Sequence, residues 1–107
     1  MSPDNRPIGI FDSGVGGLSV LRAIRDQLPD ENFIYIADQT HVPYGPRPKT
    51  EVERLSQGIV RFLVNRDAKL VVVACNTASA AALKKLRASY PGLPFVGMEP
   101  AVKPAAE

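Results

Sequence analysis

The most reactive side chain of the sequence occurs once, as Cys75. It follows the apolar run at 70–74 and precedes the polar pair Asn76 and Thr77, so we expect it where a buried strand ends and a helix begins. A helix N-terminus carries partial positive charge and free N–H groups, which favour a thiolate over a thiol. Cys75 is therefore a candidate catalytic residue, with Asn76 or Thr77 capping the helix. A buried core cysteine is the alternative, and the polar neighbours favour function.

A second set of polar residues ends the first apolar run. Asp12 and Ser13 follow residues 8–11, and three of the next four residues are glycine. Asp12 could accept a proton, bind an ammonium group or accept backbone N–H bonds, and the glycine amides could hold an anion. No Gly-Lys-Ser/Thr of a P-loop follows, and Ser19 stands where a dinucleotide-binding motif has its third glycine. Close packing of strand against helix explains the glycines equally well.

The third candidate segment is a long loop at 38–49. It contains Pro43, Tyr44 and Gly45, together with the only histidine of the chain, His41. Tyr44 could present its hydroxyl, and backbone N–H groups beside it could hold a carboxylate. His41 has no cysteine or second histidine at ligand spacing, so we predict a solvated histidine and no metal site.

The elements that must position these segments alternate along the chain. Short apolar runs predict strands at 8–11, 33–37, 70–74 and 95–98, and helical periodicity predicts helices at 18–28, 50–63 and 78–88. Thr50 and Glu53 match a capping box at the start of the second helix. With right-handed crossovers, this order predicts an α/β fold: an open three-layer sandwich with a mainly parallel, four-stranded, flavodoxin-like sheet.

In such a sheet, ligands bind beyond the carboxyl ends of the strands. We therefore expect Asp12-Ser13, the loop from Asp38 to Gly45, Cys75-Asn76-Thr77 and Glu99-Pro100 to converge at one edge. Glu99 could support the site as a carboxylate or be solvated.

The composition fits one globular domain. A length of 107 residues suits a single domain, and 45% hydrophobic with 22% charged residues excludes a disordered chain. The net charge of +2 is interspersed, which argues against nucleic acid and membrane surfaces as partners. No apolar run has the length of a membrane helix, and residues 1–7 lack a signal-peptide core. A single cysteine cannot form an internal disulfide and fits a reducing cytoplasm.

Four segments in series resemble bacterial glutamate racemases. Residues 8–20 (IGIFDSGVGGLSV) resemble the opening of that family, and Ala37-Asp38 with residues 43–45 resembles its second signature. Residues 73–78 (VACNTA) resemble its first catalytic cysteine motif, and residues 95–105 resemble the segment that closes its first domain. The related aspartate racemases share the Cys-Asn-Thr pattern but usually open differently, so the glycine-rich opening favours glutamate.

The resemblance implies a cofactor-independent racemisation by two cysteines on opposite faces of the substrate. Cys75 would be one proton donor and acceptor, and Asp12 would assist it and interact with the substrate ammonium. The remaining matched residues would bind the substrate: Ser13, Pro43, Tyr44, Gly45, Asn76 and Thr77. The D-glutamate formed would supply peptidoglycan synthesis in the bacterial cytoplasm.

The chain departs from the family pattern because it lacks the second half of the family's catalytic apparatus. The family carries a second cysteine in a Gly-Cys-Thr-His motif of a second domain, and this chain has only Cys75. Residues 102–107 look like a helix that does not develop, so we expect a first domain truncated from a longer protein and inactive alone; a frayed natural terminus is the alternative.

Competing functions also stay open. They are an aspartate or other amino-acid racemase, a non-catalytic anion-binding module, and an association partner that uses an uncovered sheet edge. The sequence also leaves open whether the protein is a homodimer.

Overall fold

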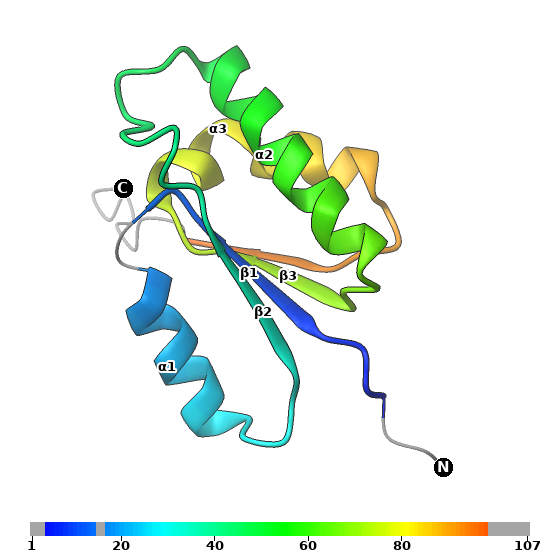
Figure 1. The fold of residues 1–107 in the computed structure, drawn as a ribbon. Coiled ribbons are helices and arrows are strands. Elements are labelled where there is room, and N and C mark those ends of the chain that lie inside the picture. Colours follow the sequence, from blue (N-terminus) through cyan, green and yellow to red (C-terminus); the bar gives the residue numbers. More distant parts are fainter. Residues whose placement is uncertain (1–3, 15–16, 99–107) are drawn as a thin grey trace, which may run out of the picture.

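The computed structural model describes residues 4–14 and 17–98, in which strands and helices alternate as expected (Figure 1). The strands are β1 (Ile8–Asp12), β2 (Phe33–Ala37), β3 (Leu70–Val73) and β4 (Phe95–Gly97), and the helices are α1 (Gly17–Gln27), α2 (Lys49–Asn65) and α3 (Asn76–Ser89). They form one four-stranded sheet in the order β2-β1-β3-β4, with every pairing parallel. The predicted α/β class with a parallel four-stranded sheet is confirmed.

The helices lie on both faces of the sheet, which gives three layers (Figure 1). Side chains alternate between faces along a strand. Ile8, Ile10 and Val72 therefore pack toward α1, whereas Phe11 and Val71 pack toward α2 and α3. Because β1 and β3 are central and covered on both faces, they are continuous apolar runs.

Backbone hydrogen bonds align the ends of three strands at one edge of the sheet. The carbonyl of Asp12 accepts the N–H of Asp38 at 2.9 Å, and the carbonyl of Phe11 accepts the N–H of Ala74 at 2.7 Å. The chain therefore leaves β1, β2 and β3 side by side. This edge is where the predicted functional segments begin.

The start of α2 corrects one prediction. The carbonyl of Pro48 accepts the N–H groups of Glu51 and Val52 at 3.0 and 3.1 Å, so Pro48 is the N-cap and no side chain caps the helix. Thr50 lies inside the first turn, and Glu53 instead contacts Lys85 Nζ at 3.4 Å. The capping box was wrong because the helix begins at Lys49, one residue before Thr50, so the Thr50 side chain is already inside the helix and does not occupy the N-cap position.

Of the remaining expectations, the structure addresses the one about membrane helices. No helix within the described parts of the chain is long and apolar enough to cross a membrane. The predictions for Glu99, Pro100 and the helix start at 102–107 lie outside the described residues.

Candidate active site

Cys75 occupies the N-cap of α3, directly beyond the buried end of β3. Its Sγ accepts the N–H of Ala78 at 3.4 Å. The thiol also donates to Ser13 Oγ at 3.3 Å. The prediction that Asn76 or Thr77 caps the helix was wrong, because the extended backbone of Cys75 (φ −147°, ψ 123°) aims its own sulfur at the free N–H groups.

Asp12 lies at the end of β1 with 1% of its surface exposed. Its Oδ1 accepts the N–H of Ser13 at 2.8 Å. The Tyr35 side chain of β2 lies close enough to this carboxylate to interact with it electrostatically. Burial raises the pKa of Tyr35, and the nearby negative charge of Asp12 raises it further, so the phenol stays protonated.

Tyr35 was not predicted as a site residue. Its position could have been inferred from the alternation of side chains along a strand. Tyr35 pairs with Ile10 in the parallel register, and Asp12 follows Ile10 by two residues on β1, so all three face the same side of the sheet.

A hollow of about 350 Å³ collects five of the eight predicted site residues. They are Asp12, Ser13, Cys75, Asn76 and Thr77, and the remaining wall is formed by Val20, Ala74 and Met98. The volume lies in the range of small-molecule sites. The residues come from the ends of β1 and β3, from the position after β4 and from the starts of α1 and α3, as the topology of a parallel sheet requires.

Met98 was not predicted as a site residue, and a buried serine determines its position. Ser79 Oγ accepts the N–H of Met98 at 2.9 Å and donates to the carbonyl of Val73 at 3.2 Å. Ser79 thereby ties the end of β4 to the end of β3. The only feature of the sequence that could have indicated this role is the position of Ser79, which follows Cys75 by four residues and therefore lies one turn further along α3.

The segment Pro43-Tyr44-Gly45 does not line this hollow. Tyr44 is 2% exposed, its hydroxyl donates to Asp38 Oδ2 at 2.6 Å, and its ring packs on Phe11 with the centroids 6.4 Å apart. Pro43 and Gly45 are exposed. The expectation that Tyr44 presents its hydroxyl to a ligand is therefore not met in this structure, because Asp38 already accepts that hydroxyl.

His41 is better connected than the solvated histidine that the sequence predicts. Its Nδ1 lies 2.8 Å from Asp38 Oδ1. Its side chain is nevertheless 41% exposed. No group of three His, Cys, Asp or Glu side chains in the described part of the chain is arranged to hold a metal ion.

Gly14 fits the loop closely against the first turn. Its φ is +154°, and a Cβ atom at this position would lie 2.4 Å from Val42 Cγ1. The carbonyl of Gly14 accepts the side-chain amide of Gln39 at 3.3 Å. Because any larger residue would displace Val42, the glycine lets the loop and the Asp12-Ser13 turn touch. The glycine-amide anion cradle involves residues 15 and 16, which lie outside the described chain.

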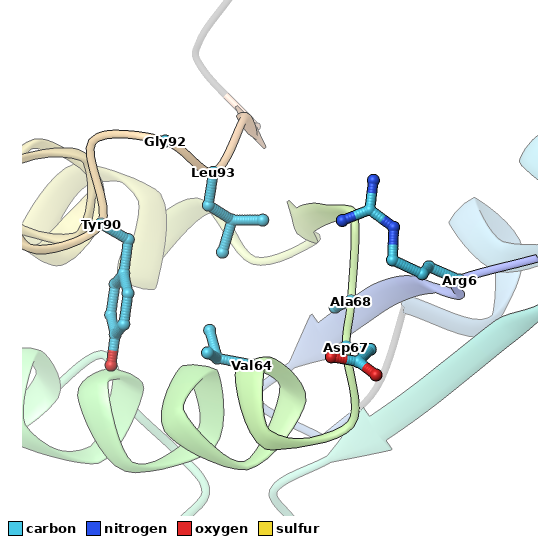
Figure 2. A pocket seen from close by; sticks show the side chains of 7 residues that line it. All are labelled: Arg6, Val64, Asp67, Ala68, Tyr90, Gly92 and Leu93. Atoms are coloured by element: carbon cyan, nitrogen blue, oxygen red, sulfur yellow. The ribbon is translucent and has the colours of Figure 1, made fainter. Parts of the chain in front are cut away.

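A separate hollow of about 320 Å³ lies at the opposite end of the sheet (Figure 2). Its walls are Arg6, Val64, Asp67, Ala68, Tyr90, Gly92 and Leu93, and none of the predicted site residues is among them. Arg6 is already paired with Asp4 through two hydrogen bonds of 3.0 and 2.8 Å. We therefore assign the chemistry to the hollow around Cys75.

That hollow can support proton transfer by one thiol. A thiolate of Cys75 would accept hydrogen bonds from the Ala78 N–H and from the Ser13 hydroxyl, which can rotate to donate. Asp12, the residue that directly precedes Ser13, adds a buried carboxylate to the same hollow. A single thiol reaches one face of a bound molecule.

Comparison with known proteins gives one consistent match, although no family model matches the chain. The chain is 58% identical over 101 residues to the glutamate racemase of Roseiflexus sp., covering 94% of this chain and 37% of that protein. It is 55% identical over 106 residues to that of Pseudomonas paraeruginosa, covering 99% and 40%. The chain thus spans about two fifths of the length of these curated relatives.

The solved structures to which the chain is similar are also glutamate racemases. Glutamate racemase from Thermus thermophilus superposes with a TM-score of 0.82 at 49% identity, covering 87% of this chain and 36% of that one. The Escherichia coli enzyme, solved with L-glutamate and the activator UDP-MurNAc-Ala, gives 0.84 at 46% identity, covering 94% and 38%. In sequence and in fold, the chain is similar to the portion of these glutamate racemases that it spans.

Proposed function

We propose that the protein interconverts L- and D-glutamate without a cofactor. The observation that carries the proposal is the hydrogen-bonded Cys75 sulfur, which shares a hollow with the buried carboxylate of Asp12. The relatives named above support the choice of substrate. The Francisella tularensis racemase, similar with a TM-score of 0.82 at 34% identity, was solved with D-glutamate.

In this proposal Cys75 carries the proton on one face of the substrate. As a thiolate it removes the proton from Cα, and as a thiol it returns one in the reverse direction. The Ala78 N–H and the Ser13 hydroxyl stabilise the thiolate form, and the start of α3 adds the positive end of the helix dipole. The difficult part is the weak acidity of Cα, which needs hydrogen-bond donors around the developing charge and little water.

The other wall residues bind the substrate. Asp12 interacts with the ammonium group and assists Cys75, and Ser13, Asn76 and Thr77 offer donors to a carboxylate. Pro43, Tyr44 and Gly45 contribute from the neighbouring loop. The available donors are the backbone N–H groups of Tyr44 and Gly45, because the Tyr44 hydroxyl is bonded to Asp38 and proline has no N–H.

The second proton carrier lies on another part of the protein. We propose that residues 1–107 are the first domain of a two-domain racemase and that a cysteine of the second domain faces Cys75 across the substrate. The chain holds one cysteine, and a single thiol serves one face of Cα. In this proposal the isolated 107 residues are inactive. D-glutamate would supply peptidoglycan synthesis in the cytoplasm, and a homodimer is one arrangement that would help close the site.

The experiment is proton exchange with the full-length protein. L-glutamate and, separately, L-aspartate are incubated in deuterium oxide, and the Cα-proton signal and optical rotation are followed together. We expect both to decay with glutamate and neither with aspartate, and Cys75→Ser to stop inversion. Inversion of aspartate alone would transfer the proposal to an aspartate racemase, and no exchange with either substrate would favour a binding module.

A further inference from the structure

Asp38 forms hydrogen bonds with several parts of the site region, although no functional role has been assigned to it so far. It follows β2 directly, and its N–H donates to the carbonyl of Asp12 at 2.9 Å. Its carboxylate accepts the Tyr44 hydroxyl at 2.6 Å and contacts His41 Nδ1 at 2.8 and 3.0 Å. One residue therefore bonds both the first turn and the loop that contains Pro43, Tyr44 and Gly45.

Further hydrogen bonds between residues of the 41–47 loop hold it in its conformation beside the Asp38 carboxylate. Arg47 Nε donates to the carbonyl of His41 at 2.8 Å, and the N–H of Arg47 donates to the carbonyl of Tyr44 at 2.9 Å. Arg47 also pairs with Glu51 at 2.6 Å, which fixes it to the first turn of α2. The side chain of Asp38 is only 11% exposed, so water competes little for these hydrogen bonds.

Tyr44 joins the loop to the buried surroundings of Cys75. Both residues belong to one buried cluster on the α2 and α3 side of the sheet, together with Phe11 and Ala78. The Tyr44 ring is held between Phe11 on β1 and the carboxylate of Asp38. A shift of Tyr44 would therefore move the backbone of its two neighbours relative to the hollow.

The pKa shifts of Asp38 and Tyr44 are consistent with the hydrogen bond between them. Burial by itself raises the pKa of Asp38, but the hydrogen bonds from Tyr44 and His41 outweigh it and leave that pKa below its ordinary value. Burial raises the pKa of Tyr44, and its hydrogen bond to Asp38 raises it further. At neutral pH the pair is a carboxylate that accepts from a protonated phenol.

We propose that Asp38 is a positioning residue: its carboxylate, through Tyr44 and His41, holds the 41–47 loop against the Asp12-Ser13 turn, so that the loop is preorganised to bind substrate. The inference rests on the proposed function for the identity of that substrate, glutamate. Asp38 itself does not line the hollow around Cys75 and transfers no proton.

The first test separates binding from turnover in the full-length protein. Asp38→Ala removes both hydrogen bonds and Tyr44→Phe removes one, so we expect the KM for glutamate to rise about tenfold, with kcat changed much less. Asp38→Asn keeps an oxygen that can accept from Tyr44 and should restore most of the binding. Combining Asp38→Ala with Tyr44→Phe should add little to either alone.

The control is Tyr90→Phe. The Tyr90 ring packs on Phe95 with its centroid 6.4 Å away, the same separation as in the Tyr44 pair, but at the other end of the sheet. We expect its KM to equal that of the wild type. Because KM does not depend on the folded fraction, an unchanged KM in Asp38→Ala would overturn the proposal. A loss confined to kcat would also overturn it, since it would assign Asp38 to the chemistry.

A second test needs no activity. With tyrosine labelled at ring Cζ, the Tyr44 signal is identified by its absence in Tyr44→Phe and followed by NMR against pH. We expect Tyr44 to ionise at lower pH in Asp38→Ala than in the wild type, and an unchanged titration would overturn the proposal. If the wild type does not racemise glutamate but the titration shifts as expected, the proposed function fails and the role of Asp38 in holding the loop stands.

Discussion

Cys75 Sγ and Ser13 Oγ lie 3.3 Å apart, although the two residues are separated by 62 positions in the sequence. The contact exists because β1 and β3 are adjacent and parallel, with Phe11 opposite Val73, so both chains turn out of the sheet at the same level. The sulfur thereby has a side-chain partner as well as the Ala78 N–H. A thiolate at this position is stabilised by two donors from different elements.

Ser13→Ala should lower kcat for glutamate about tenfold, since it removes one hydrogen bond to a charge formed during turnover, and should raise KM by a smaller factor, since it also removes one donor to the substrate carboxylate. Steady-state racemisation by the full-length protein measures both constants. Ser19→Ala is the matched control, because Ser19 is exposed on α1 and should behave as the wild type. A tenfold rise in KM at constant kcat would instead make Ser13 only a contact of the ground-state substrate.

Asp12→Asn should lower kcat about a hundredfold, more than it changes KM, because a buried carboxylate beside the reacting thiol acts on proton transfer. The amide keeps the shape of the side chain, so the fold should persist, which circular dichroism checks. Asp26→Asn, on the exposed surface of α1, serves as the control for loss of one negative charge. If only KM rises, Asp12 contributes uniform binding and not proton transfer.

The placement of the main site residues could be predicted because it follows from topology. Asp12-Ser13 and Cys75-Asn76-Thr77 each follow an apolar run, and parallel strands end at a common edge, so a shared hollow was expected before any contact was known. The parallel sheet followed from the same alternation of short apolar runs with helical periods.

The side-chain pairings could not be predicted. The hydrogen bond from Tyr44 to Asp38 and the approach of Tyr35 to Asp12 depend on ring directions that no spacing rule specifies. The start of α2 was misplaced because the Thr50 and Glu53 pattern competes with Pro48, whose carbonyl accepts the first helical N–H groups. Local signals of similar strength conflict there, and the backbone conformation at the proline decides between them.

Gly14→Ala should destabilise the protein by about 2 kcal/mol, because its φ of +154° disfavours a side chain and a Cβ would strike Val42. Chemical denaturation measures the loss. Adding Val42→Ala should recover part of it by removing the clash while leaving the backbone strain. Gly58→Ala is the control: this glycine lies inside α2 with nothing within 4 Å of its Cβ position, and alanine there should add about 0.5–1 kcal/mol.

Ser56→Ala should stabilise the protein by about 1 kcal/mol. Ser56 is 0% exposed, and its Oγ has no hydrogen-bond partner among the described residues, so its desolvation is uncompensated. Ser79→Ala is the opposite case, since that buried hydroxyl bonds both Val73 and Met98, and its removal should lower stability by a similar amount. Equal destabilisation by the two alanines in thermal unfolding would show that Ser56 has a partner after all.

Asp38 should make stability fall in acid. Its folded-state pKa lies below the ordinary value of 3.8: burial raises it, but the hydrogen bonds from Tyr44 and His41 lower it by more. A depressed pKa contributes stability that is complete above the ordinary value and is lost as pH falls from there through the folded pKa. Urea unfolding of the full-length protein between neutral pH and pH 2 should therefore show a decline that is shallower in Asp38→Asn, which cannot be protonated, and in Tyr44→Phe, which loses the stronger hydrogen bond. Parallel curves for the wild type and Asp38→Asn would mean that the carboxylate has the same proton affinity in the folded and unfolded chains.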